Sequence, residues 1–563
     1  MHVQQLYHNA FGEYLMLHSF LLTQYDTFAS LFQFGAMIGS LAAISLLGKH
    51  FNFSYRYQLL AAVLLFCLPI GIFESTTTQV DYITCYFFLC FLLFGYRMIH
   101  TGSREATLFC LLSLAFAGFT KYSALLYALP FSIYFGISVL IRYSIKQFLQ
   151  LTVVAILILA LVFSPFFYRN LELFDSVLSP IKNSELYTES IPVERHSVGG
   201  TLSNVVKNIG LHLGLPYNNY NVKVDSLIAS FHKTINVPLH DPSTSLDRYY
   251  TRFSIQEDMA PNSFHFYLFI LVLPLLLTKA RNYQILLLIA LAITGFILSS
   301  FLLKFQFWSS RTQMPFFAML SLAISYTFTR VFKNADYLLS CFLLLTVIPI
   351  IYGNPSKNII SFKYIFKKTF NHIPRDITIS DSNNIITYQR EVGKYYAINR
   401  SEKVYPLLHK NLDYSQRSLV FYKLDKLGYY GEERDRNIFN DDRLKLTFQS
   451  HLADYFKLKS IQYFPERASR IGVFFKHEVG FYHFWSAFQY NSSGKVDMHY
   501  IRYKRKYALL KNARKDWKYE YILTDDLKLL ADQLPEKAID TIYGSENLAL
   551  VKLKTPQNSL YLY

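Results

Sequence analysis

Long apolar runs separated by short polar connectors fill residues 30–352. A helix needs about 20 apolar residues to cross a bilayer, and several of these runs are somewhat shorter than that. The pattern predicts a polytopic bundle of about ten membrane-spanning helices, in which the shorter passes pack among the others. The runs lie near 30–48, 57–73, 82–96, 106–119, 123–140, 148–168, 264–278, 284–303, 313–329 and 336–352.

The two ends of the chain follow other patterns. Residues 1–29 are amphipathic, and we expect them to lie at the interface on the outer face rather than to cross the membrane. Residues 353–563 are polar and basic, and β-like segments alternate there with helix-like ones. The fold class is therefore expected to be mostly α, with a transmembrane bundle at 30–352 and a C-terminal soluble α/β domain at 353–563. The predicted strands are 377–379, 419–422, 471–475, 519–523 and 548–553, and the predicted helices are 440–456 and 525–532, the latter capped by Thr524.

Lysine and arginine gather in every second connector of the bundle. These basic connectors are 49–56, 97–104, 142–146, 279–281 and 330–333. Basic loops remain on the cytoplasmic side, so the alternate connectors should reach the outer face together with residues 1–29 and 353–563. The outer connectors are then 74–81, 120–122, 169–262 and 304–311. The connector 169–262 is too long for a plain loop, and we expect short helices in it.

The net charge of +17 is explained first by these membrane-flanking cations. No basic patch has the signature of a nucleic-acid-binding fold, so we expect membrane lipids and no nucleic acid as partners. All five cysteines lie in apolar runs, which is typical of buried hydrophobic residues rather than of a disulfide or zinc framework. His212, His232, His240 and Asp241 lack short metal-ligand spacing, so no metal site or cofactor is predicted, although a divalent ion stays open.

The predicted outer face combines carboxylates and cations near helix ends. Cations of this kind stabilise a departing phosphate, and a carboxylate can deprotonate an incoming hydroxyl group. Each residue also has a plainer interpretation as an interfacial anchor, a snorkelling lysine, a solvated pair or a turn. The candidates are Glu13, Glu74, Asp81, Glu257 and Asp258 as catalytic carboxylates; Lys121, Arg169, Lys304 and Arg311 as phosphate ligands; and Asn170, Gln306, Trp308, His240 and Asp241 as substrate-binding residues.

Short motifs run in order through residues 1–352. They are Glu13-Tyr14, Phe32-Gln33, Glu74 to Asp81, Gly118 to Lys121, Pro165 with Arg169-Asn170, Asp241-Pro242 with Thr244, Glu257 to Asn262, and Lys304 with Gln306, Trp308, Arg311 and Pro315. In this order they resemble the bacterial family 39 type of membrane glycosyltransferase, the protein O-mannosyltransferase-like and aminoarabinose-transferase-like group with the GT-C fold.

The resemblance implies a hexosyl or pentosyl transferase of the cell envelope. Such an enzyme moves a sugar from a polyprenyl-phosphate donor to a lipid, glycan or protein acceptor, by direct displacement with inversion. It implies a multi-pass protein of the bacterial inner membrane whose C-terminal domain is periplasmic. The cations would hold the donor phosphate, a carboxylate would activate the acceptor, and Trp308 would stack on sugar or prenyl chain.

One feature of the family is missing from this sequence. Enzymes of this type usually carry an earlier span followed by an acidic motif in the first outer loop, and this chain starts after that point. We therefore expect either that Glu13, Glu74 or Asp81 supplies the base, or that the chain is a truncated or non-catalytic assembly subunit. A lipid or solute transporter is a further alternative, but its spans should be broken and charged at their centres, whereas these span interiors are nearly free of charge.

Overall fold

A computed structural model of the chain describes residues 7–178 except 24, 191–353 except 255 and 256, the strand pair at 376–389 except 382 and 383, and most of 452–563. The predicted strand at 419–422 and most of the predicted helix at 440–456 lie outside the described residues. The chain forms two compact units. The first consists of Met1–His50, Ser75–Ser190 and Asp441–Tyr563, and the second of Phe51–Glu74 and Ile191–Asn440.

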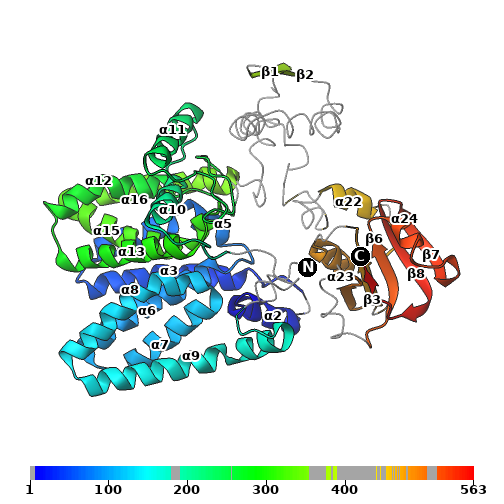
Figure 1. Cartoon of the computed structure of the whole chain (residues 1–563), viewed down its shortest axis with the longest axis horizontal. Helices are drawn as coiled ribbons and strands as arrows, with labels where there is room; N and C mark the ends of the chain where they lie inside the picture. The colour runs from blue at the N-terminus through cyan, green and yellow to red at the C-terminus, as the bar shows by residue number, and fades with distance from the viewer. Residues whose placement is uncertain are drawn as a thin grey trace. The chain divides into compact units, whose positions relative to one another are not determined.

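The helices of the first unit pack around α6 (Figure 1). This helix is buried along most of its length against α3, α7 and α8, and it is rich in Phe, Leu and Cys. A helix that is apolar on all sides is typical of the centre of a membrane bundle. The bundle helices of this unit are α2 (Phe11–Thr23), α3 (Leu31–His50), α6 (Asp81–Thr101), α7 (Arg104–Thr120), α8 (Tyr122–Arg142) and α9 (Ile145–Phe174).

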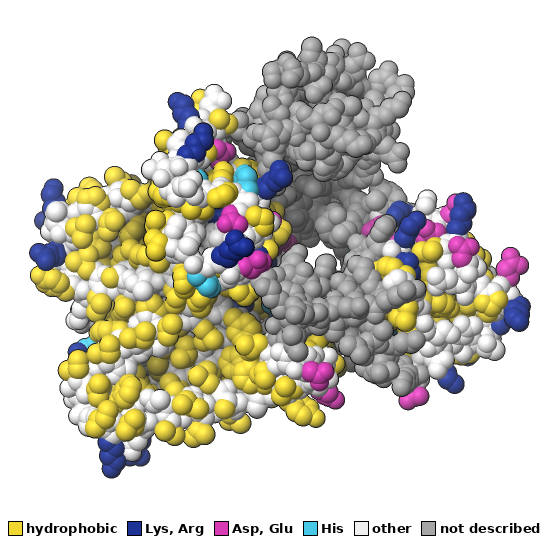
Figure 2. Space-filling view, in the orientation of Figure 1, with side chains coloured by type: hydrophobic (Ala, Val, Ile, Leu, Met, Phe, Trp, Pro, Cys, Tyr) yellow, Lys and Arg dark blue, Asp and Glu magenta, His cyan; other side chains and the backbone are white. Residues whose placement is uncertain are grey.

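The outer surface of these helices is itself apolar. Along α9, large side chains such as Leu149, Ile156 and Leu161 are exposed. Figure 2 shows apolar side chains spread over the face of the helices that it presents. A continuous apolar surface of this extent is unfavourable in water and natural in lipid, so the bilayer is the solvent of these helices.

The second unit packs around α15, which is buried almost throughout against α4, α12 and α13. Its bundle helices are α4 (Tyr55–Phe66), α5 (Pro69–Glu74), α12 (Ser263–Leu277), α13 (Tyr283–Leu302), α14 (Ser309–Thr312), α15 (Met314–Val331) and α16 (Ala335–Gly353). The long connector adds two short helices, as predicted: α10 (Val198–Gly210) and α11 (Asn218–Thr234). A strand pair, β1 (Asp376–Asp381) and β2 (Asn384–Gln389), completes the described part of this unit.

The structure confirms a polytopic, mostly helical chain. Seven helices in the described part of the chain are long and apolar enough to cross a membrane: α3, α6, α8, α9, α13, α15 and α16. The predicted run at 57–73 is not one helix, because α4 ends at Phe66 and α5 begins at Pro69. Proline disfavours a helical conformation in the residue before it and lacks the N–H that would continue the helix. The helices α4 and α12 are apolar but shorter, as several of the predicted runs required.

The C-terminal domain is an α/β sheet with strand order β4-β3-β6-β8-β7 (Figure 1). The first three of these strands are parallel, and β8 is antiparallel to both β6 and β7. Alternate residues of β3, β6 and β8 are buried in two separate cores, one on each face of the sheet. The elements are α22 (Leu452–Lys459), β3 (Ser469–Phe474), α23 (Tyr482–Asn491), β4 (Val496–Tyr500), β5 (Arg502–Tyr503), β6 (Tyr519–Thr524), α24 (Leu527–Ala531), β7 (Ile539–Ser545), β8 (Leu548–Gln557) and β9 (Tyr561–Leu562).

The sequence-based prediction found β1, β3, β6 and β8 and missed β2, β4, β5, β7, β9 and α23. Most residues of β7 are exposed, so this edge strand lacks the apolar pattern that marks a buried one. The predicted cap of the helix after β6 was also wrong. The N-cap of α24 is Asp526, whose carboxylate accepts the N–H of Leu529, whereas the Thr524 hydroxyl bonds to the backbone of Asp526.

Candidate functional site

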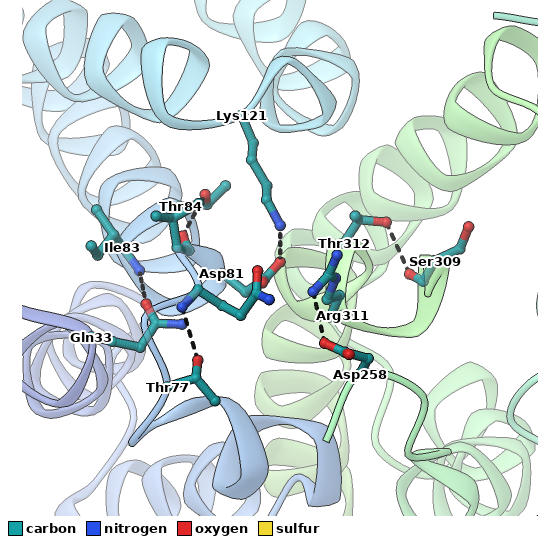
Figure 3. Close-up of polar contacts among 12 residues, drawn as sticks. Gln33, Thr77, Asp81, Ile83, Thr84, Lys121, Asp258, Ser309, Arg311 and Thr312 are labelled. Atoms are coloured by element: carbon teal, nitrogen blue, oxygen red, sulfur yellow. Dashed lines mark hydrogen bonds and ion pairs between the residues drawn. The ribbon is translucent and has the colours of Figure 1, made fainter. Parts of the chain in front are cut away.

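The first unit holds an ion pair between the buried Asp81 and the half-buried Lys121. Asp81 is the first residue of α6 and is 2% exposed. Lys121 is the one extended residue between α7 and α8, and its ammonium group reaches the Asp81 Oδ1 at 2.5 Å (Figure 3). The N-terminus of α6 carries a partial positive charge, so helix dipole and lysine both stabilise the carboxylate.

The second carboxylate oxygen of Asp81 remains available. Among the described residues, Oδ2 is buried and has no hydrogen-bond partner. A buried acceptor without a donor is unfavourable, by about 1–3 kcal/mol in protein interiors. Asp81 therefore presents an acceptor that a hydroxyl group of a ligand would satisfy.

Glu13 on α2 lies beside this pair. Gly12 permits the approach, because a Cβ atom there would come within 2.3 Å of the Val80 side chain, at the N-cap of α6. Although the Glu13 side chain reaches solvent, the surrounding protein desolvates its carboxylate and raises its pKa. Lys121 lowers that pKa and Asp81 raises it further, so both charges act on the Glu13 carboxylate.

Arg169, near the end of α9, is connected to the same helix α2. Its guanidinium group donates to the Tyr14 hydroxyl at 3.4 Å and lies over the Phe166 ring at 5.1 Å. In the described part of the chain its Nε–H has no partner. Asn170 is fully buried instead, and its amide donates to the carbonyls of Val177 and Leu178. The structure thus gives Asn170 a role in holding the turn after α9.

The remaining predicted cations form ion pairs within the second unit. Arg311 on α14 donates to the Asp258 Oδ1 at 2.9 Å (Figure 3). Lys304 is 5% exposed, and its ammonium group reaches the Glu194 Oε1 at 2.6 Å. Glu194 was not singled out from the sequence, where it is one of several carboxylates in the long connector.

The other predicted residues take separate positions. Glu74 is completely buried at the end of α5, whereas Trp308 is exposed at the N-cap of α14. His240 accepts the backbone N–H of Tyr249, and Asp241 accepts that of Ser243. The backbone N–H groups of Thr244 and Ser245 also donate to the Asp241 carbonyl, so a turn begins at Asp241, which was its plainer interpretation. Gln306 and Glu257 are both half-buried.

Sequence analysis missed a buried polar face on α10. Asn204, Lys207 and Asn208 have at most 5% exposure; the two asparagines donate to Ser300 of α13 and Lys207 donates to Ser245 of the long connector. The signal was present, because these residues share one side of a helix at spacings of three and four. The histidines considered as metal ligands have separate hydrogen-bond partners: His212 contacts Gln313, and His232 contacts Ser203.

Comparison with known proteins gives little further information. No protein-family model matches the chain, and no curated protein matches it. Among solved structures, the crystal structure of ArnT from Cupriavidus metallidurans bound to undecaprenyl phosphate is similar, with 10% sequence identity and a TM-score of 0.46. The match covers 97% of this chain and 88% of that one. A similarity at this level transfers neither ligand nor activity to this chain.

Proposed function

We propose that the chain is a membrane glycosyltransferase of GT-C architecture that uses a polyprenyl-phosphate sugar as donor. The observation that carries the proposal is the pair between the buried Asp81 and Lys121, with Glu13 beside it, at the ends of apolar helices. Ionisable groups held at membrane helices are costly and usually functional. A carboxylate cluster with cations meets the two needs of the reaction: a base for the acceptor and a counter-charge for the leaving phosphate.

In the proposed reaction, Glu13 accepts the proton of the acceptor hydroxyl group. The acceptor oxygen forms a bond to the anomeric carbon while the bond from that carbon to the phosphate oxygen breaks, with inversion. The polyprenyl phosphate departs with the electron pair of the broken bond, and Lys121 and Arg169 stabilise its charge. Asp81 orients Lys121, and its free Oδ2 accepts a hydrogen bond from a substrate hydroxyl group. Glu13 is preferred as base because it reaches solvent, whereas Asp81 is buried and paired.

Lys304 and Arg311, both in the second unit, are also proposed to bind phosphate, because ammonium and guanidinium groups form charge-assisted hydrogen bonds to phosphate oxygens. Trp308 is exposed and is proposed to stack on the sugar or prenyl chain. From the topology that the basic connectors predict, we further propose that the chemistry takes place on the outer face of the inner membrane. The C-terminal domain at 353–563 would lie on the same side and contribute to binding of the lipid, glycan or protein acceptor.

The test is sugar transfer by the purified protein in lipid, with radiolabelled polyprenyl-phosphate sugars. We expect Asp81→Asn and Lys121→Gln each to lower transfer by about 100-fold or more, in the range of a lost electrostatic contact at the reacting centre. Asp336→Asn is the matched control, because Asp336 is equally buried and paired with Arg56 but follows a basic connector. Donor binding without turnover in any form would favour the assembly subunit, and no donor binding would refute the transferase.

A further inference from the structure

His212 joins the two segments that carry the Arg311–Asp258 ion pair. The ring is 1% exposed and lies just after α10. Its Nδ1 contacts the backbone N–H of Asn262 at 3.1 Å, and its Nε2 contacts the Gln313 Oε1 at 2.6 Å. Asn262 follows Asp258 closely in the chain, and Gln313 follows Arg311 closely. One imidazole ring therefore bridges both sides of the ion pair.

The direction of these hydrogen bonds is determined by one group. A backbone N–H can only donate, so the Nδ1 of His212 accepts from Asn262 and the proton resides on Nε2. Nε2 then donates to Gln313, whose Nε2 donates to the Asn208 Oδ1 at 3.1 Å. Asn208 in turn donates to the Ser300 Oγ at 3.1 Å. Burial lowers the pKa of His212 to about 4, with the bond to Gln313 opposing, so the neutral ring persists at physiological pH.

A buried hydrogen-bond chain of this kind has one satisfied arrangement, and any displacement of a member leaves a buried polar group unpaired. Gln313 is the N-cap of α15 and directly follows α14, which carries Arg311. We propose that His212 is a positioning residue: it sets the α14 turn against the 258–262 segment and thereby orients the Arg311 guanidinium group for the donor phosphate. The orienting part rests on the function proposed above for Arg311.

Two conservative variants each remove one side of the bridge. In His212→Asn the side-chain amide reaches only the position of Nδ1, so it retains Asn262 and loses Gln313. In His212→Gln the amide reaches the position of Nε2, so it retains Gln313 and loses Asn262. His232 provides the matched control, since it is 2% exposed and bonds to Ser203 and to the Ile228 carbonyl. His232→Asn and His232→Gln lose a comparable buried bond without touching either segment.

The link that His212 makes between the two segments is tested in the absence of any polyprenyl-phosphate sugar. Cysteines replace Asp258 and Arg311 in a Cys341→Ser background, because Cys341 is exposed while the other native cysteines are buried. A short bis-methanethiosulfonate reagent then reports how often the two positions meet. We expect cross-linking to slow about threefold or more in both His212 variants and to stay unchanged in both His232 variants. An unchanged rate in the His212 variants overturns the inference.

The orienting role is tested by binding of polyprenyl phosphate to the full chain in lipid. We expect each His212 variant to weaken binding about tenfold when Arg311 is present and to have no further effect in Arg311→Ala, because residues that act through one another are non-additive. An equal loss in both backgrounds overturns positioning through Arg311. If Arg311→Ala alone leaves binding unchanged, the donor role of Arg311 and the orienting role of His212 both fail, and cross-linking still decides the bridge.

Discussion

The ammonium group of Lys207 donates a hydrogen bond to the Ser245 hydroxyl at 2.5 Å, and Lys207 has no exposed surface. The ring of Phe305 faces its ammonium group at 5.4 Å. The backbone around Ser245 pairs with Phe305, so this lysine joins α10 to the point where the long connector meets the segment after α13. Burial lowers the pKa of Lys207 to about 7, and Asp241 partly opposes that shift.

We expect Lys207→Met to be more stable than the wild type at pH 6 by about 1–2 kcal/mol, because it removes a buried charge. The folded chain releases the lysine proton near pH 7 and the unfolded chain near 10.5, so wild-type stability rises between those values. The advantage of the variant should therefore shrink at pH 9. Thermal unfolding at both pH values measures this, with the exposed Lys233→Met as control. An advantage that is constant with pH would contradict the buried charge.

Gly12 should control the position of Glu13. A methyl group at Gly12 would meet the Val80 side chain at 2.3 Å and push α2 away from the start of α6. We expect Gly12→Ala to lower kcat/KM for sugar transfer about tenfold and to destabilise the fold by about 1–3 kcal/mol. Gly35→Ala is the control, because no atom lies within 4 Å of its added Cβ and alanine favours helix α3 by about 0.5–1 kcal/mol. Full activity in Gly12→Ala would argue against a role for Glu13.

The identity of the base determines the acidic limb of the pH profile. A base must be deprotonated, so kcat/KM should fall as the pH drops through the pKa of Glu13, which desolvation holds above the ordinary glutamate value. Glu13→Gln should lower kcat/KM by about 10²–10⁴-fold and abolish that limb. Glu172→Gln, which removes an exposed carboxylate on α9, should change neither. If kcat/KM of Glu13→Gln still fell at acidic pH, the general base would be another carboxylate. Asp81 would be the first of these to test.

Local patterns predicted the helices and most of the candidate residues, but not their partners. The apolar runs predicted helices correctly because a bilayer requires every backbone group to bond within its own helix. Asp81 and Lys121 were both singled out, yet nothing local to either shows that they touch across two helices. Lys304 obtained its partner from Glu194, a carboxylate without any distinguishing neighbour in the sequence. Such pairings depend on tertiary packing, which the spacing of residues along one segment does not contain.

Variants of Lys304 and Glu194 can show whether this ion pair belongs to the donor site or is only structural. Lys304 is nearly buried, whereas Glu194 is 42% exposed and competes with any anion for the lysine. If Lys304 binds the donor phosphate, Lys304→Met should weaken binding of polyprenyl phosphate about tenfold, and Glu194→Gln should strengthen it, because the competing carboxylate is gone.

A purely structural pair predicts a different result. Removing Glu194 would then leave a buried cation without its counter-charge and cost stability, by about 1–3 kcal/mol, while donor affinity stayed constant in both variants. Binding isotherms and thermal unfolding of the same preparations in lipid decide between the two. Lys279→Met, which removes an exposed lysine in a basic connector, controls for the loss of general positive charge. A structural ion pair cannot explain weaker donor binding in Lys304→Met together with stronger donor binding in Glu194→Gln. That combination requires Glu194 to compete with the donor phosphate for Lys304.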